Sequence, residues 1–99
     1  MTKQELVAKM QRHQAWVLGK RVKLDFGNDG TVLVDGVGCV VSEVEGPADA
    51  TVGINWTDWL ALSQGRLEPM SAYMMGKLRV SGDTGVAMQL GSLLAKLKS

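Results

Sequence analysis

Apolar residues near the N-terminus recur at the spacing of one helix face. This stripe consists of Leu6, Val7, Met10, Val17 and Leu18. Just before it, Thr2 and Glu5 match a capping box, in which each side chain accepts a hydrogen bond from the other residue's backbone N–H. Gly19 can take the left-handed conformation that ends a helix. The pattern predicts a helix over residues 3–18.

The apolar period then shortens to two, which is typical of strands with one buried face. The first alternating positions are Val22, Leu24 and Phe26. The GNDG that follows, residues 27–30, predicts a tight turn because Asn, Asp and Gly tolerate positive φ. Three more strands are predicted, at residues 31–35, 39–45 and 50–55. In the strand at 39–45, Val40 and Val44 are the apolar positions. Short strands joined by tight turns predict an antiparallel meander.

Two short helices are predicted after the fourth strand. Asn55 or Thr57 can cap the first helix, and Gly65 ends it. Pro69 suits the first turn of the second, where its missing N–H has no helical partner, and Gly76 ends that helix. Each glycine is followed by a basic residue and a leucine, so the repeated triplet marks two successive helix ends.

The last part of the chain predicts one more strand and one more helix. Residues 78–81 form the strand, and Asp83 is placed to cap the helix. The apolar stripe of that helix consists of Val86, Leu90, Leu93, Leu94 and Leu97. The order of elements predicts an α+β fold over residues 1–99 as a single domain, with helices covering one face of a five-stranded, mostly antiparallel sheet.

Composition narrows the function classes. The 99 residues carry eleven basic and ten acidic side chains, and nucleic-acid binding normally requires a strong basic excess. The single Cys39 cannot form an internal disulfide, which favours a reducing compartment. The chain has neither a signal-peptide layout nor an apolar run of the roughly 20 residues that a membrane span needs. A cytoplasmic protein without membrane insertion is expected.

Few residues could carry catalysis. His13 and Cys39 are the only residues of their types, and neither lies in a recognised catalytic signature. They cannot supply the four ligands of a structural zinc site. The GVG at residues 36–38 lacks the third glycine and the helix of a dinucleotide-binding loop, and Asp58 and Glu68 are read as solvated side chains. The sequence therefore predicts no cofactor, no metal and no catalytic residue.

The remaining feature is an excess of soft apolar side chains in the two short helices. Met70, Tyr73 and Met74 share one helix face. The residues Trp56, Trp59 and Leu60 cluster on the preceding helix. Each could be plain core, but methionine also recurs on surfaces that accept variable apolar partners. Gly85 and Gly91 leave volume missing from the last helix, and together these features indicate room for a lipid.

The same region resembles a known family. Residues 65–90, GRLEPMSAYMMGKLRVSGDTGVAMQL, are similar to the signature half of the sterol carrier protein type-2 family. The shared features, in order, are a Gly-basic-Leu, a Pro-Met helix, Gly-Lys-Leu, a short strand, Gly-Asp and a C-terminal helix. A weaker similarity covers GPADATVGI, residues 46–54.

The resemblance implies a hydrophobic tunnel between sheet and helices that holds a fatty acid, fatty acyl-CoA, phospholipid or sterol-like ligand. By position, its lining would comprise Trp59, Leu60, Met70, Tyr73, Met74, Val80, Met88 and Gly91. This chain departs from the family pattern at Gly91, where relatives often place a polar residue such as Gln near the ligand, and the resemblance therefore implies no particular headgroup contact there. Ala95-Lys96-Leu97 resembles a peroxisomal signal, but two residues follow it.

Three functions follow from these observations. The preferred one is a non-enzymatic, monomeric carrier of a lipid or another hydrophobic small molecule. The second is an accessory domain whose apolar groove docks a lipid-metabolising enzyme or a partner helix. The third is an acyl thioester hydrolase, for which the sequence offers no nucleophile–base pair.

Overall fold

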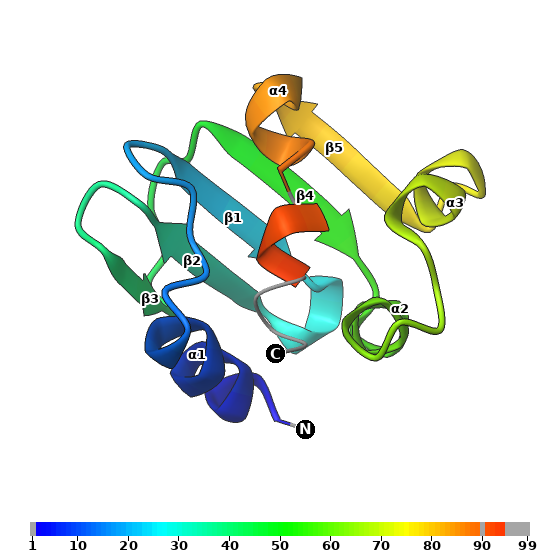
Figure 1. Ribbon diagram of the computed structural model, residues 1–99, viewed down its shortest axis with the longest axis horizontal. Helices are drawn as coiled ribbons and strands as arrows, with labels where there is room; N and C mark the ends of the chain where they lie inside the picture. The colour runs from blue at the N-terminus through cyan, green and yellow to red at the C-terminus, as the bar shows by residue number, and fades with distance from the viewer. Residues whose placement is uncertain (1, 90, 95–99) are drawn as a thin grey trace.

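The computed structural model of the chain describes residues 2–89 and 91–94. Its centre is a five-stranded sheet in the order β3-β2-β1-β4-β5 (Figure 1). The strands are β1 Arg21–Asp25, β2 Thr31–Asp35, β3 Val40–Ser42, β4 Ala50–Ile54 and β5 Leu78–Gly82. The helices are α1 Lys3–Arg12, α2 Trp56–Ser63, α3 Pro69–Met74 and α4 Thr84–Ala87, with a 3-10 turn η1 at Gly27–Asp29. The predicted α+β class with one five-stranded sheet is confirmed.

The strand order corrects the predicted meander. β1 pairs antiparallel with β2 on one side and parallel with β4 on the other. The chain therefore leaves β3 at one edge and crosses back over β2 and β1 before it forms β4. Three of the four pairings are antiparallel, so the sheet is mixed but mostly antiparallel.

This crossover runs over the face of the sheet that the helices leave open. Glu45 Oε1 accepts a hydrogen bond from the Thr31 hydroxyl at 2.9 Å, and its other carboxylate oxygen lies 3.7 Å from Lys23 Nζ. Leu33 points to this face, where a Cβ at Gly46 would lie 3.8 Å from its side chain. Leu33 is buried here, which explains why β2 has three consecutive buried residues.

The buried positions predicted for β3 are wrong. Val41 lies opposite Val34, whose side chain points toward the helices. Val41 is therefore the buried residue, whereas Val40 and Val44 are exposed. The predicted strand at 39–45 is reduced to three residues because the chain turns into the crossover after Ser42.

The first helix is shorter than predicted. Its capping box forms as expected, with Glu5 N–H donating to Thr2 Oγ1 at 3.1 Å and Thr2 N–H donating to Glu5 Oε1 at 3.2 Å. However, α1 ends at Arg12, His13 is its C-cap, and Gln14 has a φ of 52°. This turn lets Ala15 and Val17 reach the core from a loop. Leu18, predicted to be part of the stripe, is exposed.

The loop after α1 is held against the turn between β2 and β3. The Gly36 N–H donates to the Lys20 carbonyl at 2.8 Å, and the Gly19 N–H donates to the Gly36 carbonyl at 3.0 Å. A Cβ at Gly36 would overlap the Val17 carbonyl oxygen. Gly36 is therefore required for close backbone approach, and no nucleotide-binding loop is formed.

In the second half of the chain, two helices end at the glycines predicted to end them. Gly65 and Gly76 have φ values of 77° and 76°, as expected for left-handed residues just after helix ends. Asp83 caps α4 through Oδ1, which accepts from the Val86 N–H at 3.3 Å.

The last helix is interrupted, contrary to the continuous helix predicted. α4 stops at Ala87, and residues 91–94 are helical again. Hydrogen bonds of three-residue span, from Gln89 N–H to the Val86 carbonyl and from Ser92 N–H to the Gln89 carbonyl, tighten the chain between them. Leu90 and Leu97 lie outside the described residues.

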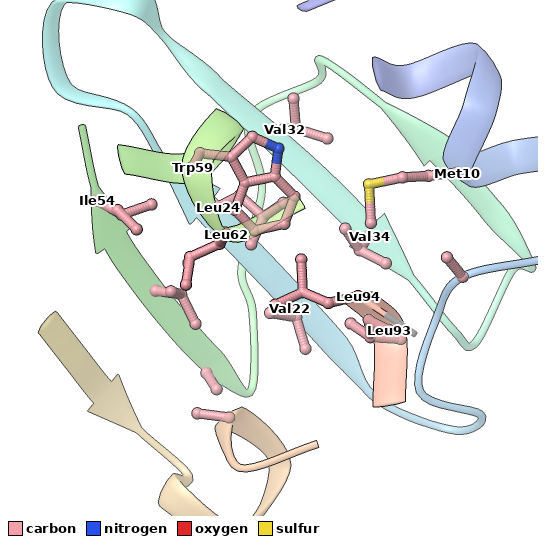
Figure 2. Packing of buried hydrophobic residues seen from close by; sticks show 14 of the residues in the cluster. Met10, Val22, Leu24, Val32, Val34, Ile54, Trp59, Leu62, Leu93 and Leu94 are labelled. Atoms are coloured by element: carbon pink, nitrogen blue, oxygen red, sulfur yellow. The ribbon is translucent and has the colours of Figure 1, made fainter. Parts of the chain in front are cut away.

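The core lies between one face of the sheet and the helices. Strand residues from β1, β2 and β4 meet side chains from α1, α2 and residues 93–94 (Figure 2). Its largest fully buried side chains include Trp59, Leu6, Met10, Leu24, Ile54 and Leu62. Phe26 packs edge-on against Trp56, with ring centroids 4.9 Å apart. Among the described residues, no helix is long and apolar enough to cross a membrane.

Candidate apolar groove beside the edge strand

An apolar groove lies over β5, the edge strand of the sheet. Figure 1 shows α3 near the start of this strand and α4 near its end. The cavity between them has a volume of about 240 Å³. Its lining consists of Pro69, Met70, Tyr73, Leu78, Val80, Thr84, Ala87, Met88 and Gly91.

The alternation of β5 builds the floor of the groove. Leu78 and Val80 lie opposite Ile54 and Val52, so all four side chains point to the helical face of the sheet. Arg79 points to the opposite face, where its guanidinium lies beside Gly53. The floor is therefore apolar, and the nearest strand cation is directed away from it.

Small residues bring the two helical walls close to the sheet without filling the space between them. Ala72 is the buried residue of α3, whereas Met70 and Tyr73 are exposed beside the groove. Val86 and Ala87 anchor α4 in the core, and Met88 is exposed on the groove side. One wall thus carries a methionine and a tyrosine, and the other carries a methionine.

Gly91 is an exposed residue of this lining. A Cβ built there would have no neighbouring atom within 4 Å among the described residues. The position of a Gly91 side chain is therefore open among the described residues, which a tightly packed core would not allow.

The groove brings together five of the eight residues predicted for the tunnel lining. These are Met70, Tyr73, Val80, Met88 and Gly91. Trp59 is instead fully buried in the core, Leu60 is partly buried against the core, and Met74 is exposed without lining the groove. Contact between the five residues and a ligand stays a prediction.

Four residues of the lining were not predicted from the sequence: Pro69, Leu78, Thr84 and Ala87. Leu78 could have been found from the period of two that it shares with Val80. Pro69 was recognised only as the start of a helix. Thr84 and Ala87 carry no sequence signal for a site, because their place in the groove depends on how α4 packs against the sheet.

Trp59 is a core residue with one unsatisfied polar atom. Its Nε1 has no hydrogen-bond partner among the described residues, and its ring packs edge-on against Phe26 at a centroid distance of 5.8 Å. Figure 2 shows the indole above Leu24 and Leu62.

The groove contains no charged side chain among the described residues that line it. Away from the groove, Asp35 at the end of β2 has a lowered pKa. There the Gly38 N–H donates to Asp35 at 2.9 Å and lowers the pKa of this carboxyl group, with the Val37 N–H and Arg21 acting in the same direction. The described lining of the groove therefore offers a ligand apolar surface.

His13 and Cys39 do not contribute to the groove. His13 ends α1, and Cys39 is exposed in the turn before β3, the edge strand opposite β5. In the described part of the chain, no three His, Cys, Asp or Glu residues are grouped so that they could hold a metal ion. No described residue of the lining forms a nucleophile–base pair.

Comparisons with known proteins agree with this architecture. The rat (Rattus norvegicus) protein "Sterol carrier protein 2" is 40% identical over 70 residues, which cover 68% of this chain and 13% of the rat protein. "Hydroxysteroid dehydrogenase-like protein 2" of Xenopus tropicalis is 32% identical over 76 residues, covering 76% of this chain and 18% of that protein. The chain thus spans about an eighth of the length of the first of these relatives.

A solved structure shares the fold. The solution NMR structure of Sterol Carrier Protein-2 from Aedes aegypti, in complex with the C16 fatty acid palmitate, matches with a TM-score of 0.77 at 20% identity. The match covers 95% of this chain and 94% of that one. The model of the SCP-2 sterol transfer family matches residues 3–95. Because this match covers nearly the whole chain, the protein belongs to the SCP-2 sterol transfer family.

Proposed function

We propose that this chain is a non-enzymatic lipid-binding module that holds the apolar part of its ligand in the groove over β5. The observation that carries the proposal is the lining: apolar side chains from α3, β5 and α4 surround one cavity that contains no charged group among the described residues. Membership of the SCP-2 sterol transfer family supports a lipid as the ligand class.

Burial of apolar surface supplies the affinity. Each buried CH₂ group contributes about 0.8 kcal/mol, so an acyl chain binds without a charge contact. The cavity volume of about 240 Å³ lies just below the range of roughly 300–1,000 Å³ that is usual for ligand sites. We therefore propose that the groove takes one end of a long chain as it stands, and that α3 and α4 separate to form the full tunnel.

The ligand class follows from the same lining. A fatty acid, fatty acyl-CoA, phospholipid or sterol-like molecule can place its apolar part over Leu78 and Val80 and leave its polar group in water. The palmitate bound to the Aedes aegypti protein supports a single acyl chain as the first ligand to test. Among the described residues that line the groove, none forms the nucleophile–base pair that a hydrolase needs, which supports a binding role.

A second function, docking of this face onto a lipid-metabolising enzyme, is supported by a different observation. The relatives are much longer than this chain, and one is a hydroxysteroid dehydrogenase-like protein. An enzyme that accompanies this module is therefore a reasonable partner. The monomeric state and the cytoplasmic location stay predictions.

Native mass spectrometry and a fluorescent fatty-acid titration test the proposal. Two exposed methionines provide a matched pair, because Met88 lines the groove and Met74 does not. Met88→Glu should lower fatty-acid affinity at least about ten-fold, since a charge is placed in an apolar site. Met74→Glu should leave the affinity unchanged. Equal affinities of the two variants would overturn this location of the site, and the absence of bound lipid in the native protein would favour the docking function.

A further inference from the structure

Methionine accessibility divides sharply within the described part of the chain. Met10 has 0% of its surface exposed. The other four are all on or beside α3 and α4: Met70 is 63% exposed, Met74 81%, Met75 62% and Met88 77%. A thioether that is accessible to solvent is also accessible to small oxidants. Among the described residues, the exposed methionines therefore gather around the groove.

Two of these four methionines line the groove from opposite walls. Met70 belongs to α3, and Met88 directly follows α4. Met74 and Met75 are equally accessible but do not line the cavity. Oxidation of one pair changes the chemistry of the lining, whereas oxidation of the other pair changes only the surface around it.

We propose that Met70 and Met88 form a peroxide-sensitive modification site whose oxidation expels the apolar ligand; this inference rests on the lipid-binding function proposed above. Hydrogen peroxide is the oxidant. A sulfur lone pair attacks one peroxide oxygen, an S–O bond forms and the O–O bond breaks. The sulfur loses two electrons, and the second oxygen leaves as water after it takes up the proton of the transferred oxygen. Each methionine becomes a sulfoxide.

The sulfoxide is incompatible with the groove in its ligand-bound form. Its polar oxygen requires a hydrogen-bond partner, and an apolar chain pressed against Met70 and Met88 provides none. The remaining lining supplies one hydroxyl from each of Tyr73 and Thr84 and is otherwise apolar. Oxidation therefore favours the empty, hydrated groove. Because methionine sulfoxide is reduced enzymatically, the change is reversible.

Among the described residues, Cys39 also carries an exposed sulfur, and its oxidation must be separated from this effect. It precedes β3, which lies at the opposite edge of the sheet from β5. Its thiol can be oxidised without any change in the groove lining. A Cys39→Ala background removes this reaction from the experiment.

The test compares Cys39→Ala with two variants made in the same background. In Met70→Leu/Met88→Leu the groove stays apolar but cannot be oxidised, and in Met74→Leu/Met75→Leu the surface pair is removed. Each protein is treated with hydrogen peroxide, the oxidised residues are identified by peptide mass mapping, and a fluorescent fatty acid is titrated. Melting curves before and after treatment show that each protein stays folded.

The expected result has two parts. Met70 and Met88 should be oxidised together with Met74 and Met75, well before Met10. Relative to the untreated form of each protein, the fatty-acid affinity of the parent and of Met74→Leu/Met75→Leu should then fall about ten-fold or more. The affinity of Met70→Leu/Met88→Leu, whatever its starting value, should not change on treatment. Without peroxide, Met70→Gln/Met88→Gln should reproduce the loss, because the amide imitates the polarity of the sulfoxide.

Two results would overturn the inference while leaving the proposed function intact. One is unchanged affinity of a parent protein in which Met70 and Met88 are fully oxidised. The other is an equal loss in Met70→Leu/Met88→Leu, which would place the sensitive group elsewhere. Failure of the untreated parent to bind fatty acid would instead overturn the lipid-binding function, and with it this inference.

Discussion

Apolar side chains of the helices are buried at one edge of the sheet and exposed at the other. At the β3 edge, α1 buries Leu6 and Met10 completely. At the β5 edge, α3 buries only Ala72 and leaves Met70, Tyr73 and Met74 exposed. Both helices carry apolar residues at helical spacing, so composition does not explain the difference. The difference is that α1 packs its apolar stripe against the sheet, whereas α3 holds its apolar residues beside an unfilled groove.

The two edge strands also differ in the groups that lie beside them. The Gln11 side chain accepts a hydrogen bond from the Val41 N–H at 2.8 Å and donates one to the Cys39 carbonyl at 3.2 Å. Lys3 adds an ion pair with Glu43 at 3.0 Å. These contacts close the β3 edge with polar groups, while the β5 edge is bordered by the apolar groove. The contacts at the β3 edge stabilise the fold, whereas the β5 edge leaves apolar surface open.

The largest expected effect comes from a pair of identical substitutions at the two edges. Met10→Ala should lower the free energy of unfolding by about 2–5 kcal/mol, because it opens a cavity in the core. Met70→Ala should change it by less than about 0.5 kcal/mol, because the side chain is mainly exposed. Urea denaturation of both variants measures the contrast. Similar losses would show that α3 packs as tightly as α1.

The hydrogen bonds of Gln11 at the β3 edge predict the next largest effect on stability. Gln11→Ala should lower the free energy of unfolding by about 1–3 kcal/mol, since the partly buried Val41 N–H loses its acceptor. Fatty-acid affinity per folded molecule should be unchanged, because the groove lies at the other edge. A variant with unaltered stability would mean that water replaces the Gln11 amide without cost.

Gly91→Leu should lower fatty-acid affinity without lowering the stability of the protein. The leucine would enter open space, so the apo protein should keep its stability or gain about 1 kcal/mol from the loss of a helical glycine. Fatty-acid affinity should fall because the added side chain occupies ligand volume. Thermal melts of delipidated protein, recorded beside a fatty-acid titration, measure both. A destabilised variant with normal affinity would show that Gly91 is a packing contact.

Asp35, in the half of the sheet away from the groove, should make a smaller, pH-dependent contribution to the free energy of unfolding. Its pKa is lowered from the usual 3.8 in the folded state, so its contribution to stability is present above that value and is lost as the pH falls through the folded-state pKa. The difference in unfolding free energy between the native protein and Asp35→Asn should therefore shrink in acid. Denaturation at neutral and acidic pH tests this, and a difference that grows in acid would contradict the shift.

The smallest effect should be that of salt on binding. Screening acts on exposed charges and hardly on apolar burial, and no charged residue is among the described residues that line the groove. Fatty-acid affinity should change less than about two-fold between low and high ionic strength. A ten-fold fall would indicate that Arg66, Lys77 or Arg79 anchors the headgroup.

Local signals in the sequence determined which elements form and several of their ends. The capping box at Thr2, the stops at Gly65 and Gly76 and the cap at Asp83 each depend on hydrogen bonds or backbone angles within a few residues, and all are found in the structure. The order of motifs in residues 65–90 was also sufficient to identify the family. Five predicted lining residues meet in one groove because they belong to α3, to the inward side of β5 and to α4 with the residues after it.

Only the tertiary structure decided how these elements meet. The parallel pairing of β1 with β4 joins residues nearly thirty positions apart, and the burial of Leu33 depends on a crossover that no local pattern marks. Trp59 was predicted beside the ligand and is fully buried, whereas Met88 and Gly91 border open space. An apolar side chain has the same sequence signal in a core and in a groove, because hydrophobic burial has no direction. Its place is decided by the neighbours that the whole fold brings to it.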